Sequence, residues 1–96
     1  ANYCASKAGV IGYSRAIALE AARNGVTINV ICPGFIKTEM TAAMPPEVLE
    51  GAVKQIPLGR IGMPDDIANG VVFLASESAA WITGHTLSIN GGQFME

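Results

Sequence analysis

Residues from about 2 to 23 carry small and apolar side chains at helical spacing. Arg15, Glu20 and Arg23 interrupt this pattern along one edge, as expected where a helix meets water. Asn24 and Gly25 follow, and a glycine just past the last periodic residue is typical of a helix end. The pattern therefore predicts one long helix that ends at Asn24-Gly25.

The next residues change to a pattern typical of a buried strand. Positions 26–32 form a short β-branched run, and Pro33-Gly34 stops it abruptly. A helix followed by a strand after a short turn is the second half of a βαβ unit. Ligands bind beyond the carboxyl ends of strands in open α/β sheets, so residues 33–40 are a candidate binding segment. A plain turn is the alternative, and Gly34 is expected to permit an unusual backbone conformation there.

The rest of the chain predicts short helices and one further strand. Residues 38–56 indicate two short helical pieces around Pro45-Pro46, which form either a mobile lid over a substrate or a surface helix pair. Met63-Pro64-Asp65-Asp66 opens another helix, because proline and acidic residues suit a first turn. Residues 86–89 alternate and predict a final strand, which Asn90-Gly91-Gly92 ends.

Composition narrows the classes of protein. Six Lys and Arg against eight Asp and Glu give no basic footprint for nucleic acid or an anionic membrane surface. No apolar run predicts a membrane span, and no signal peptide is expected. Two cysteines, Cys4 and Cys32, lack metal-ligand spacing, so we expect no metal site and a reducing, cytoplasmic location. Trp81 is expected to fill a core or an interface, and His85 to lie at a surface or interface.

The size of the chain is unusual for its hydropathy. Half of its 96 residues are apolar, and the predicted helices are apolar on more than one side. A domain of this size cannot bury many apolar faces, since small domains bury only about 60–65% of their surface. We therefore expect residues 1–96 to be one partial domain, the C-terminal portion of a larger one.

The first residues hold the strongest candidate for chemistry. Tyr3 and Lys7 are four positions apart on the predicted helix, and residues i and i+4 lie on one helical face. A nearby ammonium group favours the phenolate form of a tyrosine and makes the phenol a better proton donor near neutral pH. Such a donor suits an enzyme that protonates an oxygen while a hydride arrives at the attached carbon.

Four motifs occur in a fixed order along the chain: Tyr3-x-x-x-Lys7, Asn29-Val30-Ile31-Cys32-Pro33-Gly34, Ile82-Thr83-Gly84 and Asn90-Gly91-Gly92. In this order and at these intervals the sequence resembles the C-terminal part of a short-chain dehydrogenase/reductase over essentially its whole length. The resemblance implies an α/β fold, the C-terminal part of a Rossmann-like doubly wound parallel sheet, with two strands and three to four helices present here. It also implies that the cofactor phosphate-binding half, and the catalytic serine and asparagine, precede position 1.

Within the family the chain is most similar to the bacterial 3-oxoacyl-[acyl-carrier-protein] reductases. The stretches that support this are Ala1-Asn2-Tyr3, Gly34-Phe35-Ile36, Ile56-Pro57-Leu58-Gly59-Arg60 and Asn90-Gly91-Gly92. The resemblance implies an oxidoreductase that reduces a 3-oxoacyl thioester to the 3-hydroxyacyl thioester in fatty acid synthesis, as part of a longer chain. NADP is the implied cofactor, with NAD as the alternative. A homotetramer, and acyl carrier protein as a partner, are implied as well.

The same resemblance assigns roles to individual residues. Tyr3 would donate the proton to the substrate carbonyl oxygen, and Lys7 would lower the pKa of Tyr3 and hydrogen-bond the nicotinamide ribose. Both residues would therefore contact cofactor as well as take part in catalysis. The backbone at Pro33, Gly34 and Ile36 would hold the nicotinamide carboxamide. Thr38 would lie near the cofactor phosphates.

Other functions stay open at this point. An acetoacetyl-CoA reductase is closely related, and a dehydrogenase of sugars, sterols or small alcohols lies within the same class of enzyme. A different alternative is an inactive, truncated segment that acts through oligomerisation. The 96 residues alone are expected to be inactive, because the motifs for the cofactor phosphates are not among them.

Overall fold

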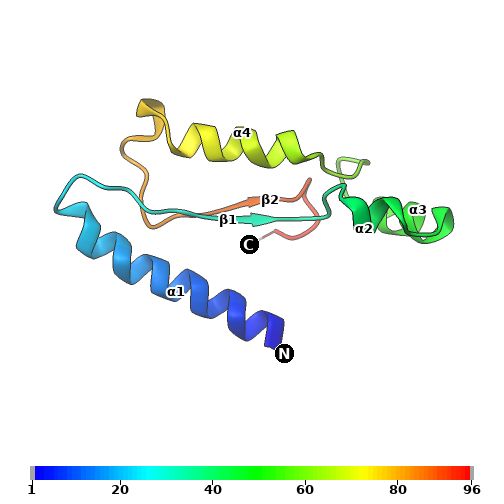
Figure 1. Ribbon diagram of the computed structural model, residues 1–96, viewed down its shortest axis with the longest axis horizontal. Coiled ribbons are helices and arrows are strands. Elements are labelled where there is room, and N and C mark those ends of the chain that lie inside the picture. Colours follow the sequence, from blue (N-terminus) through cyan, green and yellow to red (C-terminus); the bar gives the residue numbers. More distant parts are fainter. Residues whose placement is uncertain (1, 96) are drawn as a thin grey trace. The chain divides into compact units, whose positions relative to one another are not determined.

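The computed structural model describes the backbone of residues 2–95 and the side chains of residues 4–95. This part of the chain is an α/β structure with two strands, as predicted (Figure 1). No helix in it has the length and hydropathy to cross a membrane. In chain order the elements are α1 (Asn2–Ala22), β1 (Val30–Pro33), α2 (Glu39–Ala42), α3 (Pro46–Lys54), α4 (Pro64–Leu74), the 3₁₀ helix η1 (Glu77–Ala79) and β2 (Thr86–Ile89).

Contacts between Cα atoms divide the chain into two compact units. The first unit comprises Ala1–Ile31 with Val72–Leu87, and the second comprises Cys32–Val71 with Ser88–Glu96. Tyr3 and Lys7 belong to the first unit. The segment beyond the end of β1 belongs to the second unit, which therefore holds the proposed carboxamide-binding residues.

The long helix ends where the sequence predicts. Gly25 has a φ of 72°, in the left-handed region that favours glycine. Its backbone N–H donates to the carbonyl of Ala22 at 3.0 Å, and the N–H of Val26 donates to the carbonyl of Ala21 at 3.2 Å. These two hydrogen bonds form a Schellman motif, which satisfies carbonyls at the C-terminus of α1. The sequence -Asn24-Gly25- thus turns the chain from helix toward strand.

The strand predicted over residues 26–32 is shorter in the structure, where β1 begins at Val30. The backbone pairing begins earlier, since Gly84 donates its N–H to the carbonyl of Ile28 at 2.8 Å. The N–H of Ile28, however, donates to the hydroxyl oxygen of Thr83 at 3.0 Å. The hydroxyl of Thr83 takes the place of a backbone carbonyl as the acceptor, so the regular hydrogen bonding between the two strands starts only at Val30.

Asn29 ties the entry of β1 to the loop before β2 within the first unit. Its side-chain amide donates to the carbonyl of Ile82 at 3.2 Å, and its side-chain oxygen accepts the N–H of His85 at 3.0 Å. An asparagine offers both a donor and an acceptor, so one side chain satisfies two backbone groups of the facing segment. The imidazole-bearing residue His85 is exposed, as expected for a surface position.

The two strands run parallel. In the first unit Val30 donates its N–H to the carbonyl of His85 at 2.9 Å. In the second unit Gly34 donates its N–H to the carbonyl of Ile89, also at 2.9 Å. The acceptor moves forward in sequence from His85 to Ile89 as the donor moves forward from Val30 to Gly34, so the two strands run in the same direction. Pro33 is the last residue of β1, and the N–H of Gly34 still donates to the other strand just beyond it.

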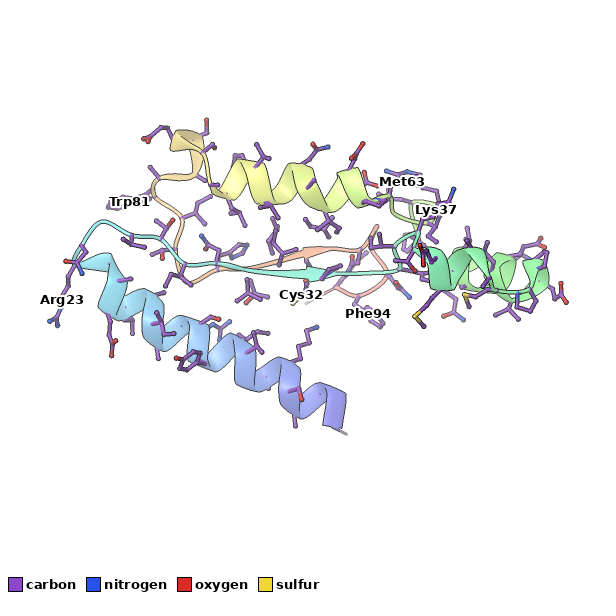
Figure 2. All side chains as sticks on the ribbon, in the orientation of Figure 1. Arg23, Cys32, Lys37, Met63, Trp81 and Phe94 are labelled. Atoms are coloured by element: carbon purple, nitrogen blue, oxygen red, sulfur yellow. The ribbon has the colours of Figure 1, made fainter. Side chains whose placement is uncertain are left out.

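Few apolar side chains are buried among the described residues. Ala18 and Ala79 are 3% and 1% exposed in the first unit, and Ile56 is 4% exposed in the second. Trp81 is 99% exposed, so the prediction that it fills a core is wrong for the described part of the chain (Figure 2). Large apolar side chains are also exposed on both long helices, as expected for helices that are apolar on more than one side: Val10, Tyr13 and Leu19 on α1, and Val71, Val72 and Phe73 on α4.

Candidate active site

The candidate proton donor and its lysine lie in the first turns of α1. The helix is continuous from Asn2 to Ala22, so positions 3 and 7 are one helical turn apart, as the sequence predicts. The side chain of Lys7 is partly buried. The side chain of Tyr3 lies outside the described residues. The roles of both residues in proton transfer therefore stay predictions.

The other four candidates lie together in the second unit, in the segment that leaves the carboxyl end of β1. Pro33 is the last residue of β1, and Gly34, Ile36 and Thr38 follow within five positions. In open α/β sheets this end of a strand is where ligands bind. Three sets of contacts hold the segment, at Gly34, at Ile36 and at Thr38.

Gly34 packs directly against the chain beyond β2. Its N–H donates to the carbonyl of Ile89, and an added Cβ would lie 2.5 Å from the Cβ of Asn90 and 2.7 Å from its Cα. Gly34 is absent from the residues with positive φ, so the expectation of an unusual backbone turn is wrong. Close packing, not backbone freedom, requires glycine at this position.

Ile36 is paired with the loop that precedes α4. An isolated parallel bridge joins Ile36 to Gly62. Gly62 donates its N–H to the carbonyl of Phe35 at 2.9 Å and accepts the N–H of Lys37 at 2.8 Å. Lys37 and Met63, which follow the two bridged residues, accordingly lie close together in Figure 2. The bridge extends the pairing of the segment past the end of β1.

Thr38 caps α2 through its side chain. Its hydroxyl oxygen accepts the N–H of Thr41 at 3.3 Å, and its own N–H donates to the hydroxyl oxygen of Thr41 at 2.7 Å. The Thr41 hydroxyl also donates to the carbonyl of Thr38 at 2.9 Å, and Thr41 is only 8% exposed. This reciprocal capping box fixes the backbone where the candidate segment enters a helix. α2 and α3 agree with the two predicted helical pieces.

An ionic network lies next to the Gly62 bridge, and the sequence interpretation missed it. Asp66 accepts two hydrogen bonds from the guanidinium of Arg60, at 2.9 and 3.2 Å, and one from the N–H of Met63 at 2.7 Å. The bonds from Arg60, followed by the bond from Met63, lower the pKa of Asp66 to about 2. Asp66 raises the pKa of Arg60 in turn. The available signal was the acidic residue at the third position of the helix, where a carboxylate can accept the backbone N–H of the residue before the helix.

A small hollow of about 160 Å³ opens beside these contacts, entirely within the second unit. Most of its lining is apolar, and the Arg60–Asp66 pair contributes the charged groups. Among the described residues, no group of three or more His, Cys, Asp and Glu side chains could hold a metal ion. The lining residues are Phe35, Ile36, Ile56, Leu58, Arg60, Gly62, Asp66, Ile89, Asn90 and Gly91.

Comparison with known proteins identifies the family. The sequence model of a family described as enoyl-(acyl carrier protein) reductase matches residues 1–93. The chain belongs to the short-chain dehydrogenase/reductase family. Its described elements are those of the C-terminal part of that Rossmann-like α/β fold, as the motifs predict.

Similar proteins carry two related names. The chain is 58% identical over 95 residues to the acetoacetyl-CoA reductase of Shinella zoogloeoides, with 98% of this chain and 39% of that protein covered. It is 53% identical to the 3-oxoacyl-[acyl-carrier-protein] reductase FabG of Escherichia coli, and 52% identical to the FabG of Rickettsia felis, each over 99% of this chain and 39% of the relative. The chain thus spans about two-fifths of the length of these curated relatives, at their C-terminal part.

Proposed function

We propose that this chain is the C-terminal part of an NAD(P)H-dependent reductase that converts a 3-oxoacyl thioester to the 3-hydroxyacyl thioester. The observation that carries the proposal is the likeness to relatives under both names, at 50–58% identity over nearly the whole chain. An acetoacetyl thioester is itself a 3-oxoacyl thioester. The two names therefore describe one reaction on two carriers, a coenzyme and a carrier protein.

In this proposal Tyr3 is the proton donor. The phenol protonates the carbonyl oxygen of the substrate, and Lys7, one helical turn away, favours the phenolate that remains. General acid catalysis of this kind contributes about 10²–10⁴ in rate. Lys7 also hydrogen-bonds the nicotinamide ribose. Both residues come from the first turns of α1, which supplies a continuous helix to carry them.

The nicotinamide cofactor supplies the hydride for the substrate carbon. The assignment of the nicotinamide carboxamide to this segment is supported by a backbone that the Gly34–Asn90 contact and the Ile36–Gly62 bridge hold in place. A fixed backbone needs little reorganisation to bind a planar amide. In this proposal Pro33, Gly34 and Ile36 bind the carboxamide, and the capped Thr38 lies near the phosphates.

The finer assignments belong to the same proposal. We infer NADP as the cofactor, with NAD as the alternative, and a role in fatty acid synthesis with acyl carrier protein as the carrier. The relative with the highest identity quoted above favours a second candidate, reduction of acetoacetyl-CoA. A cytoplasmic homotetramer is part of the first candidate.

The experiment compares substrates on the full-length protein that carries this segment. NADPH and NADH oxidation are measured with an acetoacetyl thioester of acyl carrier protein, with acetoacetyl-CoA and with a panel of sugar and alcohol substrates. The proposal predicts turnover of the thioesters, and the ratio of kcat/KM between the two thioesters identifies the carrier. Turnover restricted to sugars or simple alcohols, or none at all, contradicts the proposal.

A further inference from the structure

We propose that Arg60 and Asp66 are positioning residues for the cofactor-binding segment. Their ion pair holds the loop that contains Gly62, and Gly62 in turn holds Ile36. This inference rests on the proposed function, because it assumes that the segment at Ile36 binds the cofactor. All of the residues involved belong to the second unit.

The first step is that two residues of the loop, Arg60 and Met63, donate hydrogen bonds to the carboxylate of Asp66. Asp66 receives both guanidinium bonds of Arg60 and the N–H of Met63, so it joins positions on both sides of Gly62. Arg60 also donates to the carbonyl of Ile61 at 3.2 Å. A bidentate guanidinium–carboxylate pair fixes orientation as well as distance, which a single bond does not. The path of the chain from Arg60 to Met63 is thereby defined.

The second step is the contact between this loop and the candidate segment. Gly62 forms hydrogen bonds on both sides of Ile36, with the carbonyl of Phe35 and the N–H of Lys37. An added Cβ on Gly62 would lie 2.6 Å from Cδ1 of Ile36 and 3.9 Å from Oδ2 of Asp66. The carboxylate, the glycine and the segment are therefore adjacent, and the atom nearest to the added Cβ is the end of the Ile36 side chain. A displacement of the loop has to move the backbone of Ile36.

The third step is the small contribution of the pair to stability. The side chains of Arg60 and Asp66 are 58% and 33% exposed. Exposed ion pairs of this kind add little to the free energy of unfolding, because water and salt screen them. Removal of the pair should therefore leave the free energy of unfolding almost unchanged. A role in positioning predicts a weaker affinity for the cofactor with the thermal midpoint nearly unchanged.

The test uses the full-length protein and titration with NADPH and with NADH by cofactor fluorescence. We compare wild type with Asp66→Asn, Arg60→Gln, the double variant and Arg60→Lys. Asp65→Asn is the matched control, because Asp65 is the neighbouring acid of the same helical turn and forms none of the network bonds. Thermal midpoints, kcat and the KM for the thioester are measured in parallel.

The expected result is a dissociation constant for the cofactor about three- to tenfold higher in Asp66→Asn and Arg60→Gln, the size of effect that coupled contacts produce. The double variant should be no weaker than either single variant, and Arg60→Lys should be intermediate. The KM for the thioester and the thermal midpoint should match those of Asp65→Asn.

Wild-type cofactor affinity in Asp66→Asn would overturn the inference, and so would losses that add in the double variant. A fall in the thermal midpoint that accounts for the weaker binding would also overturn it, by showing a structural role. The readout separates this inference from the proposed function. A wild-type protein that binds the cofactor but reduces no thioester contradicts the proposed substrate and leaves the titration as the test of positioning.

Discussion

Gly34 lies against Asn90 so closely that no side chain fits between them. The Cβ that alanine would add at position 34 meets the Cβ of Asn90 at 2.5 Å and its Cα at 2.7 Å. Neither atom can move by a simple side-chain rotation. Asn90 is itself fixed, because its side-chain oxygen accepts the N–H of Gly92 at 3.0 Å and its amide donates to the carbonyl of Phe94 at 2.9 Å. The backbone just beyond β1 is thus held against the residues that follow β2 by close packing.

Gly34→Ala should therefore separate these two segments. We expect the free energy of unfolding of the full-length protein to fall by about 1–3 kcal/mol, the usual cost of overpacking. Cofactor affinity should fall with it, because the displaced backbone is the proposed carboxamide site. Denaturant unfolding and a cofactor titration measure the two effects.

Gly51→Ala is the matched control for this variant. An added Cβ at Gly51 meets nothing within 4 Å, and the residue lies in the interior of α3. Alanine there should stabilise the helix by up to about 1 kcal/mol, since glycine costs backbone entropy. Equal stability of Gly34→Ala and Gly51→Ala would show that the Gly34–Asn90 contact has no role.

Asn29→Asp should destabilise the first unit. The carboxylate can still accept the N–H of His85, but it places a second acceptor against the carbonyl of Ile82. We expect a loss of about 1–3 kcal/mol in the free energy of unfolding, the cost of a broken pair with an unsatisfied partner. Asn69→Asp on the exposed face of α4 is the control and should be close to neutral. A variant at position 29 as stable as this control would contradict the role given to Asn29.

Variants of Thr38 and Thr41 distinguish capping from cofactor contact. Thr38→Ala should lower the free energy of unfolding by about 1 kcal/mol through loss of the cap. Thr41→Ala breaks the same reciprocal box but leaves the Thr38 hydroxyl in place. If Thr38 also contacts the cofactor phosphates, Thr38→Ala should raise the cofactor KM more than Thr41→Ala does. Equal changes in KM would restrict Thr38 to its capping role.

The Arg60–Asp66 pair predicts an acid-dependent contribution to stability. The pKa of Asp66 is lowered from 3.8 to about 2 in the folded protein, so the folded state favours the carboxylate. The resulting stabilisation is present above the unfolded pKa of about 4 and is lost as the pH falls toward 2. Because the pair is exposed, its contribution is small, so wild type and Asp66→Asn should differ little in the free energy of unfolding near neutral pH. That small difference should shrink further between about pH 4 and pH 2. A difference that grows on acidification would contradict the shift.

Much of the fold follows from local sequence. The Asn24-Gly25 helix end, the Pro-Asp-Asp start of α4 and the alternation over residues 86–89 each have one dominant physical cause, and the structure places these boundaries as predicted. Prediction was weaker where side chains replace the backbone ladder. The strand at residues 26–32 starts late because Thr83 and Asn29, far from each other in sequence, supply the hydrogen bonds.

The contacts that hold the candidate site in place were harder to predict from the sequence. A glycine after a strand suggests a turn, but the need for glycine at position 34 arises from its close contact with Asn90, which lies far along the chain. The Ile36–Gly62 bridge and the Arg60–Asp66 pair likewise depend on tertiary contacts. Motif spacing located the segment that we propose to bind the cofactor, and only the structure showed which residues fix it.

The central claim is that Tyr3 donates a proton to a 3-oxoacyl thioester with help from Lys7. The most direct test is the kcat of Tyr3→Phe in the full-length protein, with an acetoacetyl thioester and saturating cofactor. Phenylalanine keeps the ring but removes the donor, so we predict a fall in kcat of about 10²–10⁴ with the thermal midpoint close to wild type. Wild-type kcat in Tyr3→Phe would contradict the proposed mechanism.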